Sequence, residues 1–406
     1  VTAMQELSES EDLQYFITEV DPEGFEIPEN ATIFARGNNL MVGIGEQARF
    51  EATGGERFQE LAKQFSEFSK DIEIIGSVDS SASSINAMAA ISFSPQSEFS
   101  SVLIVPKTLL VKRQEKAWVA SFEKDFGWPE VQKPTETKLE FKQASQTQAG
   151  FIDSVEKALE QIDDGEISKV VLARDLVAEI PADFDIRPAI EKLRERFPSC
   201  WVYSINGNFG ASPELLIRSS KGEASARVLA GTAGRGTDPD VDRAIGEGLS
   251  HSAKNLHEHN FAVDSITRAM EPFTDSVEAD KTPFSLQLPD VWHLATDIHA
   301  KLSSDASILE VASALHPTAA VAGTPRLSAQ KLIEKLEPFD RGVYAGPVGW
   351  IGSNGSGELA IALRGGRIEN DQVRAFAGCG IVSGSEPEAE LSETKLKFKA
   401  VKNAFD

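Results

Sequence analysis

Four glutamates crowd into the stretch SEPEAELSETK near the end of the chain: Glu386, Glu388, Glu390 and Glu393. Glu390 and Glu393 are three residues apart, a spacing that puts both carboxylates on one face of a helix. Two carboxylates held together repel each other unless one is protonated or a cation binds between them. An all-oxygen cluster of this kind is typical of a Mg²⁺ site. The same pattern also fits a solvated first turn of a helix, where the helix dipole favours glutamates.

A histidine-containing stretch, KNLHEHNF, raises the alternative of a zinc site, but its spacing argues against one. Successive residues of a helix turn by about 100°, so His257 and His259 point in nearly opposite directions. A zinc-protease pattern would also need histidine where Phe261 stands. No Walker A sequence occurs, and two G-x-G runs lack the third glycine of a dinucleotide-binding motif. The sequence therefore predicts neither a zinc site nor a nucleotide-binding loop.

Further stretches combine polar groups with an unusual backbone. The glycine-rich run GTAGRG (231–236) is either an anion-binding nest of backbone N–H groups or a plain loop. Arg341 in RGVYAGPVGW and Arg364 in ALRGG stand among apolar residues, where an arginine needs an anionic partner. The run HPTAAVAGTP is apolar and bounded by proline and glycine. Together these stretches favour a site for a small anion.

The elements that must position these residues are predicted from periodicity. Apolar residues recur at helical spacing in RFQELAKQFSEFSK, and two hairpin-like strand pairs follow one another between residues 342 and 382. Helices are expected over 57–70, 151–162, 186–197, 240–270 and from 385 onward. The polar stretch 139–150 is the best candidate for a linker. Consecutive hairpins with added helices favour an α+β fold with antiparallel sheets.

Composition and net charge restrict the kinds of partner that the protein is expected to bind. The 406 residues carry 40 basic and 63 acidic side chains, a net charge of −23, which argues against nucleic acid and anionic membranes. A small anionic substrate is still compatible, because a local cation outweighs distant charge. No apolar run reaches membrane-spanning length. With only Cys200 and Cys379 and no signal-like N-terminal stretch, the sequence predicts a cytoplasmic protein.

From about Ser168 onward the chain resembles the chorismate-utilising enzyme family. The motifs appear in the family's order: KVVLAR, ASPELLIR, LAGTAGRG, SAKNLHEH, WHLATDI, LHPTAAVAGTP, EPFDRGVYAGPVGW, ALRGG and AFAGCGIVSGSEPEAELSET. The resemblance implies a single large α+β domain in which two antiparallel sheets face each other and helices cover the outside. Residues 1–150 would form its N-terminal portion and residues 151–406 its chorismate-binding catalytic portion.

The resemblance also implies a use for the acidic cluster. Family members bind chorismate, a dicarboxylate, through Mg²⁺. The matching metal ligands are Glu258 and Glu393, with Glu390 acting directly or through water. Positions matching substrate contacts are Gly231, Thr232, His293, Arg364, Gly378 and Lys397.

Two positions indicate a branch of the family. Lys169 in SKVVLAR matches the general base that activates water in the isochorismate and salicylate branches. Ala230 stands where the aminodeoxychorismate branch carries a nucleophilic lysine. Glu214 in ASPELLIR matches the general acid. A lysine base must be neutral, so we expect its pKa to be lowered, and an acid must stay protonated, so we expect the pKa of Glu214 to be raised.

The expected activity is therefore the Mg²⁺-dependent, reversible isomerisation of chorismate to isochorismate. Salicylate synthesis, which adds elimination of pyruvate, is the close alternative. A non-catalytic chorismate-binding protein and a generic cation-binding surface protein are alternatives from other classes. No glutaminase-type segment is seen, so no amidotransferase partner is expected, and we expect a monomer or weak homodimer. The pathway, whether menaquinone, siderophore or salicylate, stays open.

Overall fold

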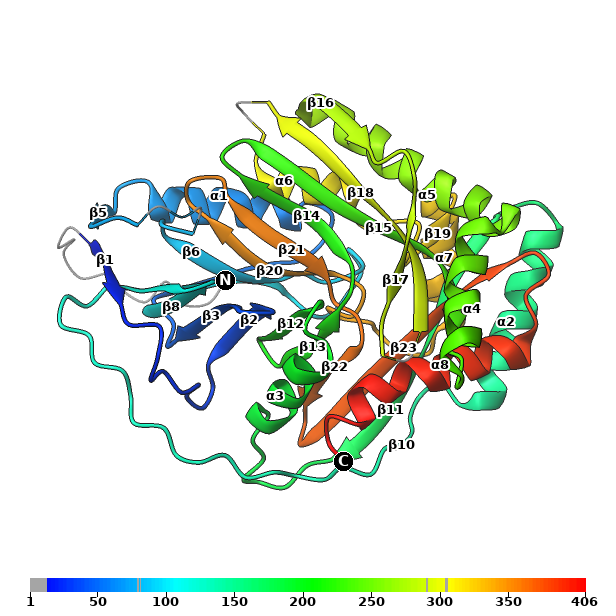
Figure 1. The fold of residues 1–406 in the computed structure, drawn as a ribbon, viewed down its shortest axis with the longest axis horizontal. Helices are drawn as coiled ribbons and strands as arrows, with labels where there is room; N and C mark the ends of the chain where they lie inside the picture. Colours follow the sequence, from blue (N-terminus) through cyan, green and yellow to red (C-terminus); the bar gives the residue numbers. More distant parts are fainter. Residues whose placement is uncertain (1–12, 79, 81, 290, 304–305) are drawn as a thin grey trace.

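Two large β-sheets form the body of the molecule, with helices packed around them (Figure 1). The structure is a computed structural model that describes residues 13–406 apart from 79, 81, 290 and 304–305. Within helix α5 (Ala253–Met270) it does not describe the side chains of residues 253–255, 257 and 258. The α+β class and the two antiparallel sheets expected from the sequence are confirmed.

The first sheet, sheet A, has 13 strands within the described residues. Across the sheet they are β10 (Lys142–Gln143), β11 (Lys169–Glu179), β23 (Gln372–Val382), β22 (Gly365–Glu369), β13 (Asn208–Ser212), β12 (Trp201–Ile205), β2 (Thr32–Arg36), β3 (Asn39–Ile44), β8 (Thr108–Arg113), β9 (Lys116–Ser121), β1 (Gln14–Val20) and β5 (Glu73–Ile75), with β19 (Gly323–Thr324) beside β11. Neighbouring strands of this sheet pair antiparallel within the described residues, except that β1 pairs parallel with β5.

The second sheet, sheet B, has 10 strands within the same described residues. Across the sheet they are β16 (Thr274–Ala279), β18 (Val291–Leu302), β15 (Glu223–Gly234), β14 (Leu215–Ser220), β21 (Gly357–Ile361), β20 (Pro347–Gly352), β6 (Asn86–Ala90), β7 (Ser101–Val105) and β4 (Ala48–Ala52), with β17 (Phe284–Gln287) beside β18. Strands β6 and β7 are buried along their whole length. The largest cluster of buried apolar residues contains members of both sheets, so the two sheets share a core. Both sheets combine strands from the first 150 residues with strands from the remainder.

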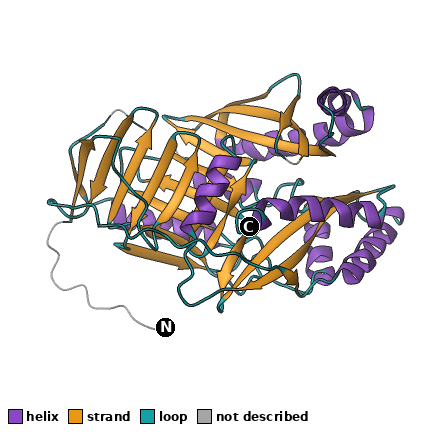
Figure 2. Cartoon of the chain, turned by 60° about the horizontal axis from the view of Figure 1, so that its bottom comes forward, coloured by secondary structure: helices purple, strands orange, loops and turns teal. Residues whose placement is uncertain are grey.

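Helices cover the ends and outer faces of the sheets. They are α1 (Arg57–Ser69), α2 (Gln148–Asp163), α3 (Arg187–Arg196), α4 (Pro239–His251), α5, the short η1 (Glu271–Phe273), α6 (Ile308–Leu315), α7 (Arg326–Leu336) and α8 (Pro387–Lys402). Helices α4 and α5 pack on β15 and β18, whereas α2 and α8 pack on β11 and β23. Figure 2 shows helices gathered toward the end of the molecule opposite β1 and β5. None of the described helices is long and apolar enough to cross a membrane.

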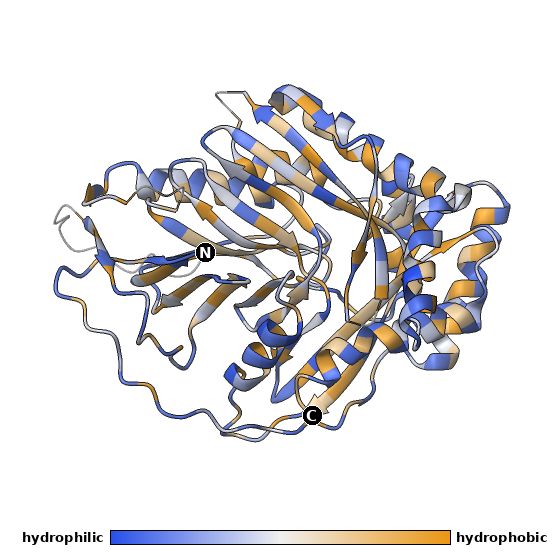
Figure 3. Ribbon diagram, in the orientation of Figure 1, coloured by the Kyte–Doolittle hydropathy of each residue, from blue (hydrophilic) through white to orange (hydrophobic). Residues whose placement is uncertain are grey.

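The helical periodicity has a clear physical basis in α1 and α3. Phe58, Leu61 and Phe65 of α1 are buried, as their spacing predicts. Helix α3 carries proline in its first turn and is mostly hydrophilic in Figure 3, with Ile190 and Leu193 turned to the core.

Two expectations about the elements are wrong. The span 240–270 is not one helix, because Ser252 adopts an extended conformation between α4 and α5, and this break lets both helices pack on the same two strands. The stretch 139–150 is not a linker, because it contains β10 and the start of α2. The backbone N–H of Leu139 also donates to the carbonyl of Phe405. The long irregular segment lies just before it, between β9 and β10.

Two of the places where the chain crosses between the sheets are neighbours in space. One crossing runs from β13 to β14 through Pro213 and Glu214, and the other runs from β21 to β22 through residues 362–364. The crossings bond to each other, since Ile361 N–H donates to the Glu214 carbonyl and Ala211 N–H donates to the Arg364 carbonyl. Arg364 has φ +51°, a left-handed conformation that turns the chain sharply. Glu214 and Arg364 are therefore held between the sheets.

Candidate active site

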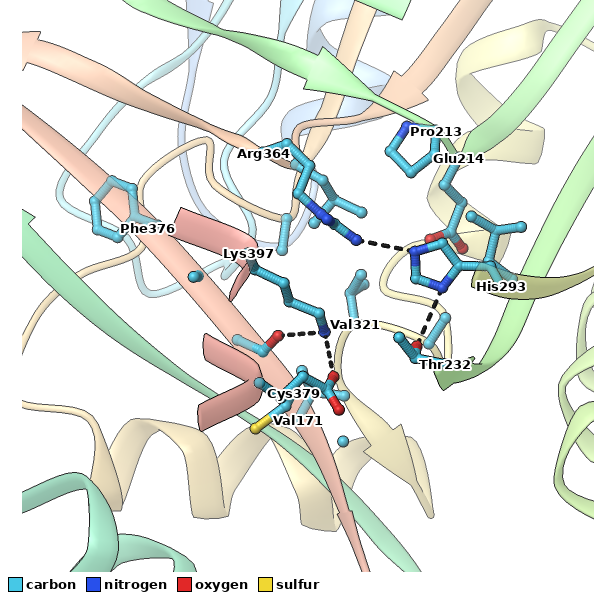
Figure 4. A pocket seen from close by; sticks show the side chains of 18 of the residues that line it. Val171, Pro213, Glu214, Thr232, His293, Val321, Arg364, Phe376, Cys379 and Lys397 are labelled. Carbon is cyan, nitrogen blue, oxygen red and sulfur yellow. Dashed lines mark hydrogen bonds and ion pairs between the residues drawn. The ribbon is translucent and has the colours of Figure 1, made fainter. Parts of the chain in front are cut away.

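The main pocket of the described structure lies between the sheets at these two crossings. It contains about 750 Å³ of empty space, counting solvent at its mouth. Its polar side chains come from six places along the chain, and several are shown in Figure 4: Glu214, Thr232, His293, Arg341, Arg364, Glu393 and Lys397. Gly231 and Gly378 line it with backbone. The size is in the range of sites that enclose small organic ligands.

A bulge in β15 shapes one wall of the pocket. Leu229 lies opposite Ala295 and Thr232 opposite His293, so β15 has one more residue than β18 over this interval. Gly231 sits in the bulge with φ +93°, a conformation that suits glycine. His259 of α5 fixes the bulge through Nδ1 to the Ala230 carbonyl, 3.1 Å away.

The plain-loop interpretation of GTAGRG is wrong for most of the motif, since residues 232–234 are paired with β18 and Gly231 lies in the bulge, while anion binding by this backbone stays a prediction. The arginine of the motif, Arg235, is ion-paired with Asp242 at 2.6 Å.

His293 connects Thr232 to Arg364 across the pocket. Its Nδ1 lies 3.1 Å from Thr232 Oγ1, and its Nε2 lies 2.9 Å from Arg364 Nη2 (Figure 4). Arginine only donates hydrogen bonds, so Nε2 must be the acceptor and Nδ1 carries the proton. Burial holds the pKa of His293 well below its usual range, helped by Arg364 and Lys397. The imidazole is therefore neutral and orients the Arg364 guanidinium.

Glu214 is a buried carboxylic acid facing the pocket. Only 4% of the surface of residue Glu214 is exposed to solvent. Burial raises the pKa of Glu214 to about 8, against the opposing influence of Lys169, Lys397 and Arg364. The raised pKa that the sequence led us to expect is present. At neutral pH Glu214 is mostly protonated and able to donate a proton.

Helix α8 supplies a cation and a carboxylate to the pocket. Lys397 Nζ donates to the Gly378 carbonyl at 2.7 Å and lies 2.7 Å from Glu393 Oε1, one turn away on the same helix (Figure 4). Burial by itself would raise the pKa of Glu393, but Lys397, with Arg364 and Lys169, lowers it overall. Glu393 is therefore an ionised carboxylate at the pocket wall.

Of the other acidic residues predicted as metal ligands, the structure describes the side chain of Glu390 but not that of Glu258. Glu390 is half-buried one turn nearer the helix start, where burial raises its pKa and hydrogen bonds from Ser385 and Cys379 oppose the rise. Glu258 lies on α5, and its side chain is outside what the structure describes. Among the described side chains, no three of His, Cys, Asp or Glu gather into a metal site. Of the predicted metal ligands, the structure thus describes the side chains of Glu393, at the pocket wall, and Glu390, nearby.

Lys169 reaches the edge of the pocket from β11. It pairs with Val382 of β23 and Thr324 of β19. A Cβ at Gly380 would lie 3.0 Å from Lys169 Cε and 3.5 Å from its Nζ, so the absence of a side chain at Gly380 makes room for the lysine. The Lys169 charge lowers the pKa of both Glu214 and Glu393, which places the ammonium near both carboxyl groups.

Arg341 has a different role from Arg364, although both line the pocket. It forms a buried ion pair with Glu337, with Nη2 2.6 Å from Oε1 and Nε 2.8 Å from Oε2. It also donates to the carbonyls of Val321 and Val171, which line the pocket. Its anionic partner is thus within the protein. Sequence reasoning missed Glu337, although the four-residue spacing in EPFDR was an available signal.

The structure therefore gathers most of the predicted site. The residues that line the pocket are Glu214, Gly231, Thr232, His293, Arg364, Gly378, Glu393 and Lys397. Lys169 and Glu390 lie beside it, and the position of the Glu258 side chain is outside the described residues. Their roles in binding and catalysis stay predictions.

Comparison with known proteins identifies the family. A family model described as "Chorismate binding enzyme" matches residues 121–406, which is more than half of the chain. This chain belongs to the chorismate binding enzyme family. It is accordingly an enzyme, and the expected family membership is confirmed.

Several relatives and solved structures show how far the similarity extends. The chain is 33% identical over 400 residues to isochorismate synthase MenF of Bacillus subtilis, covering 90% of this chain and 85% of that one. It is 40% identical over 255 residues to the salicylate biosynthesis isochorismate synthase of Pseudomonas aeruginosa, covering 62% of this chain but only 53% of the relative. A solved structure assigned as a 2,3-dihydroxybenzoate-specific isochorismate synthase, DhbC from Bacillus anthracis, superposes with a TM-score of 0.78 at 28% identity, covering 94% of this chain and 98% of that one.

Proposed function

We propose that this chain is an isochorismate synthase, an isomerase that interconverts chorismate and isochorismate with the help of Mg²⁺. The observation that carries the proposal is Glu214, a carboxylic acid held protonated in a pocket that also contains Arg364 and Lys397. The similarity to an isochorismate synthase along 90% of the chain supports it.

The pocket suits a small dicarboxylate despite the net charge of −23. Arg364 and Lys397 place two cations in a space screened from bulk solvent, where charge interactions are stronger than in water. Neutral His293 keeps the guanidinium of Arg364 in place without adding a charge of its own. We infer that these two cations bind substrate carboxylates, with Thr232 and the backbone of Gly231 and Gly378 as further contacts.

The proposed reaction moves two protons. Lys169, in its unprotonated form, takes a proton from a water molecule as the water oxygen bonds to C2 of chorismate. The ring double bonds shift, and the C4–oxygen bond breaks as Glu214 donates its proton to the leaving hydroxyl, which departs as water. Ala230 offers no nucleophile for a covalent intermediate. The net change is water added at C2 and water lost from C4.

The residues present fit Mg²⁺ by their chemistry. Mg²⁺ commonly takes one or two protein carboxylates together with waters, and Glu393 is an ionised carboxylate at the pocket wall. We propose that Glu393 and Glu258 would hold the ion, with Glu390 contributing directly or through water. When bound, Mg²⁺ would supply positive charge that receives a substrate carboxylate.

Calorimetric titration tests the metal proposal without relying on turnover. Glu258→Gln and Glu393→Gln should each weaken Mg²⁺ binding at least about tenfold, because each removes one of few anionic ligands. Glu388→Gln, in the exposed first turn of α8, is the matched control and should bind Mg²⁺ as the native protein does. Unchanged titration of Glu258→Gln would remove that residue from the site.

Product analysis tests the activity. Purified protein would be incubated with chorismate and Mg²⁺, with and without EDTA and with ammonium as a competing nucleophile, and the products separated by chromatography and identified by mass. Isochorismate that disappears on chelation is the expected result. Salicylate with equal pyruvate would establish the second candidate, salicylate synthase. An amino product would contradict the assignment of Lys169 and Ala230.

We also propose that the enzyme works in the cytoplasm as a monomer or weak homodimer, without a glutaminase subunit. Cys200 and Cys379 are both buried and unbridged, as in a reducing compartment. Analytical ultracentrifugation across a range of concentrations checks the oligomeric state, and a tight oligomer at low concentration would contradict it.

A further inference from the structure

Glu214 lines two separate cavities. One is the main pocket, and the other is a smaller cavity lined by β14, β15, α5 and the chain at 318–320. Its empty space is about 280 Å³ by the measure used for the main pocket, of which about 10 Å³ can take the centre of a water molecule. A cavity of this size holds about one water molecule when polar groups are available to bind it. The walls are otherwise mostly apolar, with Leu216 and Ile266 among them.

Thr318 lines the same small cavity with an unsatisfied hydroxyl. The residue is 7% exposed, and its Oγ1 has no hydrogen-bond partner within the part of the chain that the structure describes. Its backbone carbonyl is already occupied, since it accepts from the N–H groups of Val321 and Ala322 at 3.2 and 3.0 Å. A buried hydroxyl without a partner is unfavourable, so such groups normally bind an ordered water.

The small cavity also lies next to a hollow in the protein surface. Ile266 and Ala319 line both this cavity and a surface hollow between α5 and α6. Arg227, another residue of the small cavity, is ion-paired with Asp297 at 2.6 Å, and both side chains are partly exposed. The small cavity is therefore separated by these shared wall residues from a surface hollow that is distinct from the main pocket.

We propose that Thr318 holds a water molecule in the small cavity against the Glu214 carboxyl group, and that this water passes protons between Glu214 and solvent while substrate fills the main pocket. The inference rests on the proposed function, in which Glu214 loses a proton in each forward turnover. Afterwards the Glu214 carboxylate takes a proton from the cavity water, which takes one in turn from water at the surface. Lys169 releases the proton that it took from the attacking water to solvent in the main pocket when the product leaves, so the cycle closes with no net change in protons. Thr318 is a positioning residue, since it acts through the water.

The charges around Glu214 make a separate route useful. Lys169 of β11, Lys397 of α8 and Arg364 at the sheet crossing all act on Glu214, and Lys397 and Arg364 line the main pocket. A bound dicarboxylate would cover that side, and Glu214 is otherwise sealed from solvent. The competing route returns the proton from Lys169 through the main pocket, and it would make Thr318 irrelevant to the rate.

High-resolution crystal structures of the native protein and of Thr318→Val give the first test. The expected result is an ordered water within hydrogen-bond distance of Thr318 Oγ1 and the Glu214 carboxyl in the native protein, and its loss in the variant. A dry cavity in the native protein would overturn the proposal whatever the enzyme's product, so this result is independent of the proposed function.

Kinetics give the second test. Thr318→Val should lower kcat about tenfold with KM within about twofold, because a relay supports only part of the roughly 10²–10⁴-fold effect of general acid catalysis. The solvent deuterium isotope effect on kcat should rise, and Thr318→Ser should restore both quantities. Native kcat and isotope effect in Thr318→Val would contradict the relay. A native product other than isochorismate would refute the proposed function instead.

A matched control separates the relay from a loss of stability. Thr108→Val removes another buried hydroxyl, which lies 2.9 Å from Ser121 Oγ in β8 and β9, away from the pocket. This control should lower the melting temperature and leave kcat and the isotope effect unchanged. A matching fall in kcat in both variants would assign the effect of Thr318 to stability alone and overturn its positioning role.

Discussion

At the residue scale, Glu214 is the group whose protonation controls the proposed reaction. Its pKa is about 8 in the folded protein and 4.5 ordinarily, so the acid form is present below pH 8 and is lost as pH rises through that value. The rate from chorismate should fall over the same range. Because the folded pKa is raised, its contribution to stability is complete below pH 4.5 and declines as pH rises toward 8.

The variant Glu214→Gln tests both the effect of Glu214 on the rate and its effect on the pH dependence of stability. The amide keeps the shape but donates no proton in this step, so kcat should fall by about 10²-fold or more. Denaturation measured between pH 5 and pH 9 should lose the part of its pH dependence that Glu214 contributes. A variant with near-native kcat, or a native rate that stays flat through pH 8, would contradict Glu214 as the acid.

Lys169→Ala tests the partner base. Turnover should be abolished while the circular dichroism spectrum and melting temperature stay near native, because Lys169 lies half-buried at a pocket edge and its loss leaves no cavity in the core. Lys157→Ala is the control, since Lys157 is an exposed lysine on α2 that pairs with Asp153. Near-normal turnover in Lys169→Ala would reject the mechanism.

At the element scale, the pairing of β11 with β23 determines the position of the Lys169 side chain. A methyl group at Gly380 would approach Lys169 Cε to 3.0 Å, so Gly380→Ala should displace the lysine and lower kcat more than it raises KM. Gly248→Ala on α4 is the matched control, because no atom lies within 4 Å of its Cβ and alanine suits a helix. Equal, near-native kcat in both variants would show that the lysine position does not depend on Gly380.

Also at the element scale, the Glu337–Arg341 pair joins the end of α7 to strand β11 and to the turn at Val321 in the pocket wall. Removing one partner leaves a buried charge uncompensated, so Glu337→Gln should lower the free energy of unfolding by about 3–5 kcal/mol in urea denaturation. The exposed pair of Lys157 with Asp153 should contribute far less, and Asp153→Asn is the comparison. A loss no larger than that of Asp153→Asn would show that Arg341 is satisfied without Glu337.

At the scale of the whole molecule, the sequence predicts the class of fold better than its connections. Hairpin spacing and helical periodicity are local patterns, so α1, α3 and the strand pairs near the C-terminus could be predicted. The break at Ser252 and the place of residues 139–150 in sheet A depend on contacts with distant strands, and no local pattern reports them.

The candidate site, like the fold, could be predicted from the sequence only in part. Motif order indicated Glu214 and Arg364, but only the two sheet crossings explain why they meet. The rule that a buried arginine needs an anion could not tell Arg341, which has Glu337, from Arg364, which faces the pocket. Thr318 carried no chemical signal in the sequence, because its hydroxyl matters only through the cavity that it shares with Glu214.

The most direct test of the central claim is to follow oxygen during turnover. Chorismate would be converted by the native enzyme with Mg²⁺ in oxygen-18 water, and the isochorismate examined by mass spectrometry. The account predicts one solvent oxygen atom in each isochorismate molecule, attached at C2, because Lys169 activates water and Glu214 releases the old hydroxyl from C4. Isochorismate without solvent oxygen would mean that the hydroxyl migrates within the substrate, and it would contradict the assigned base and acid together.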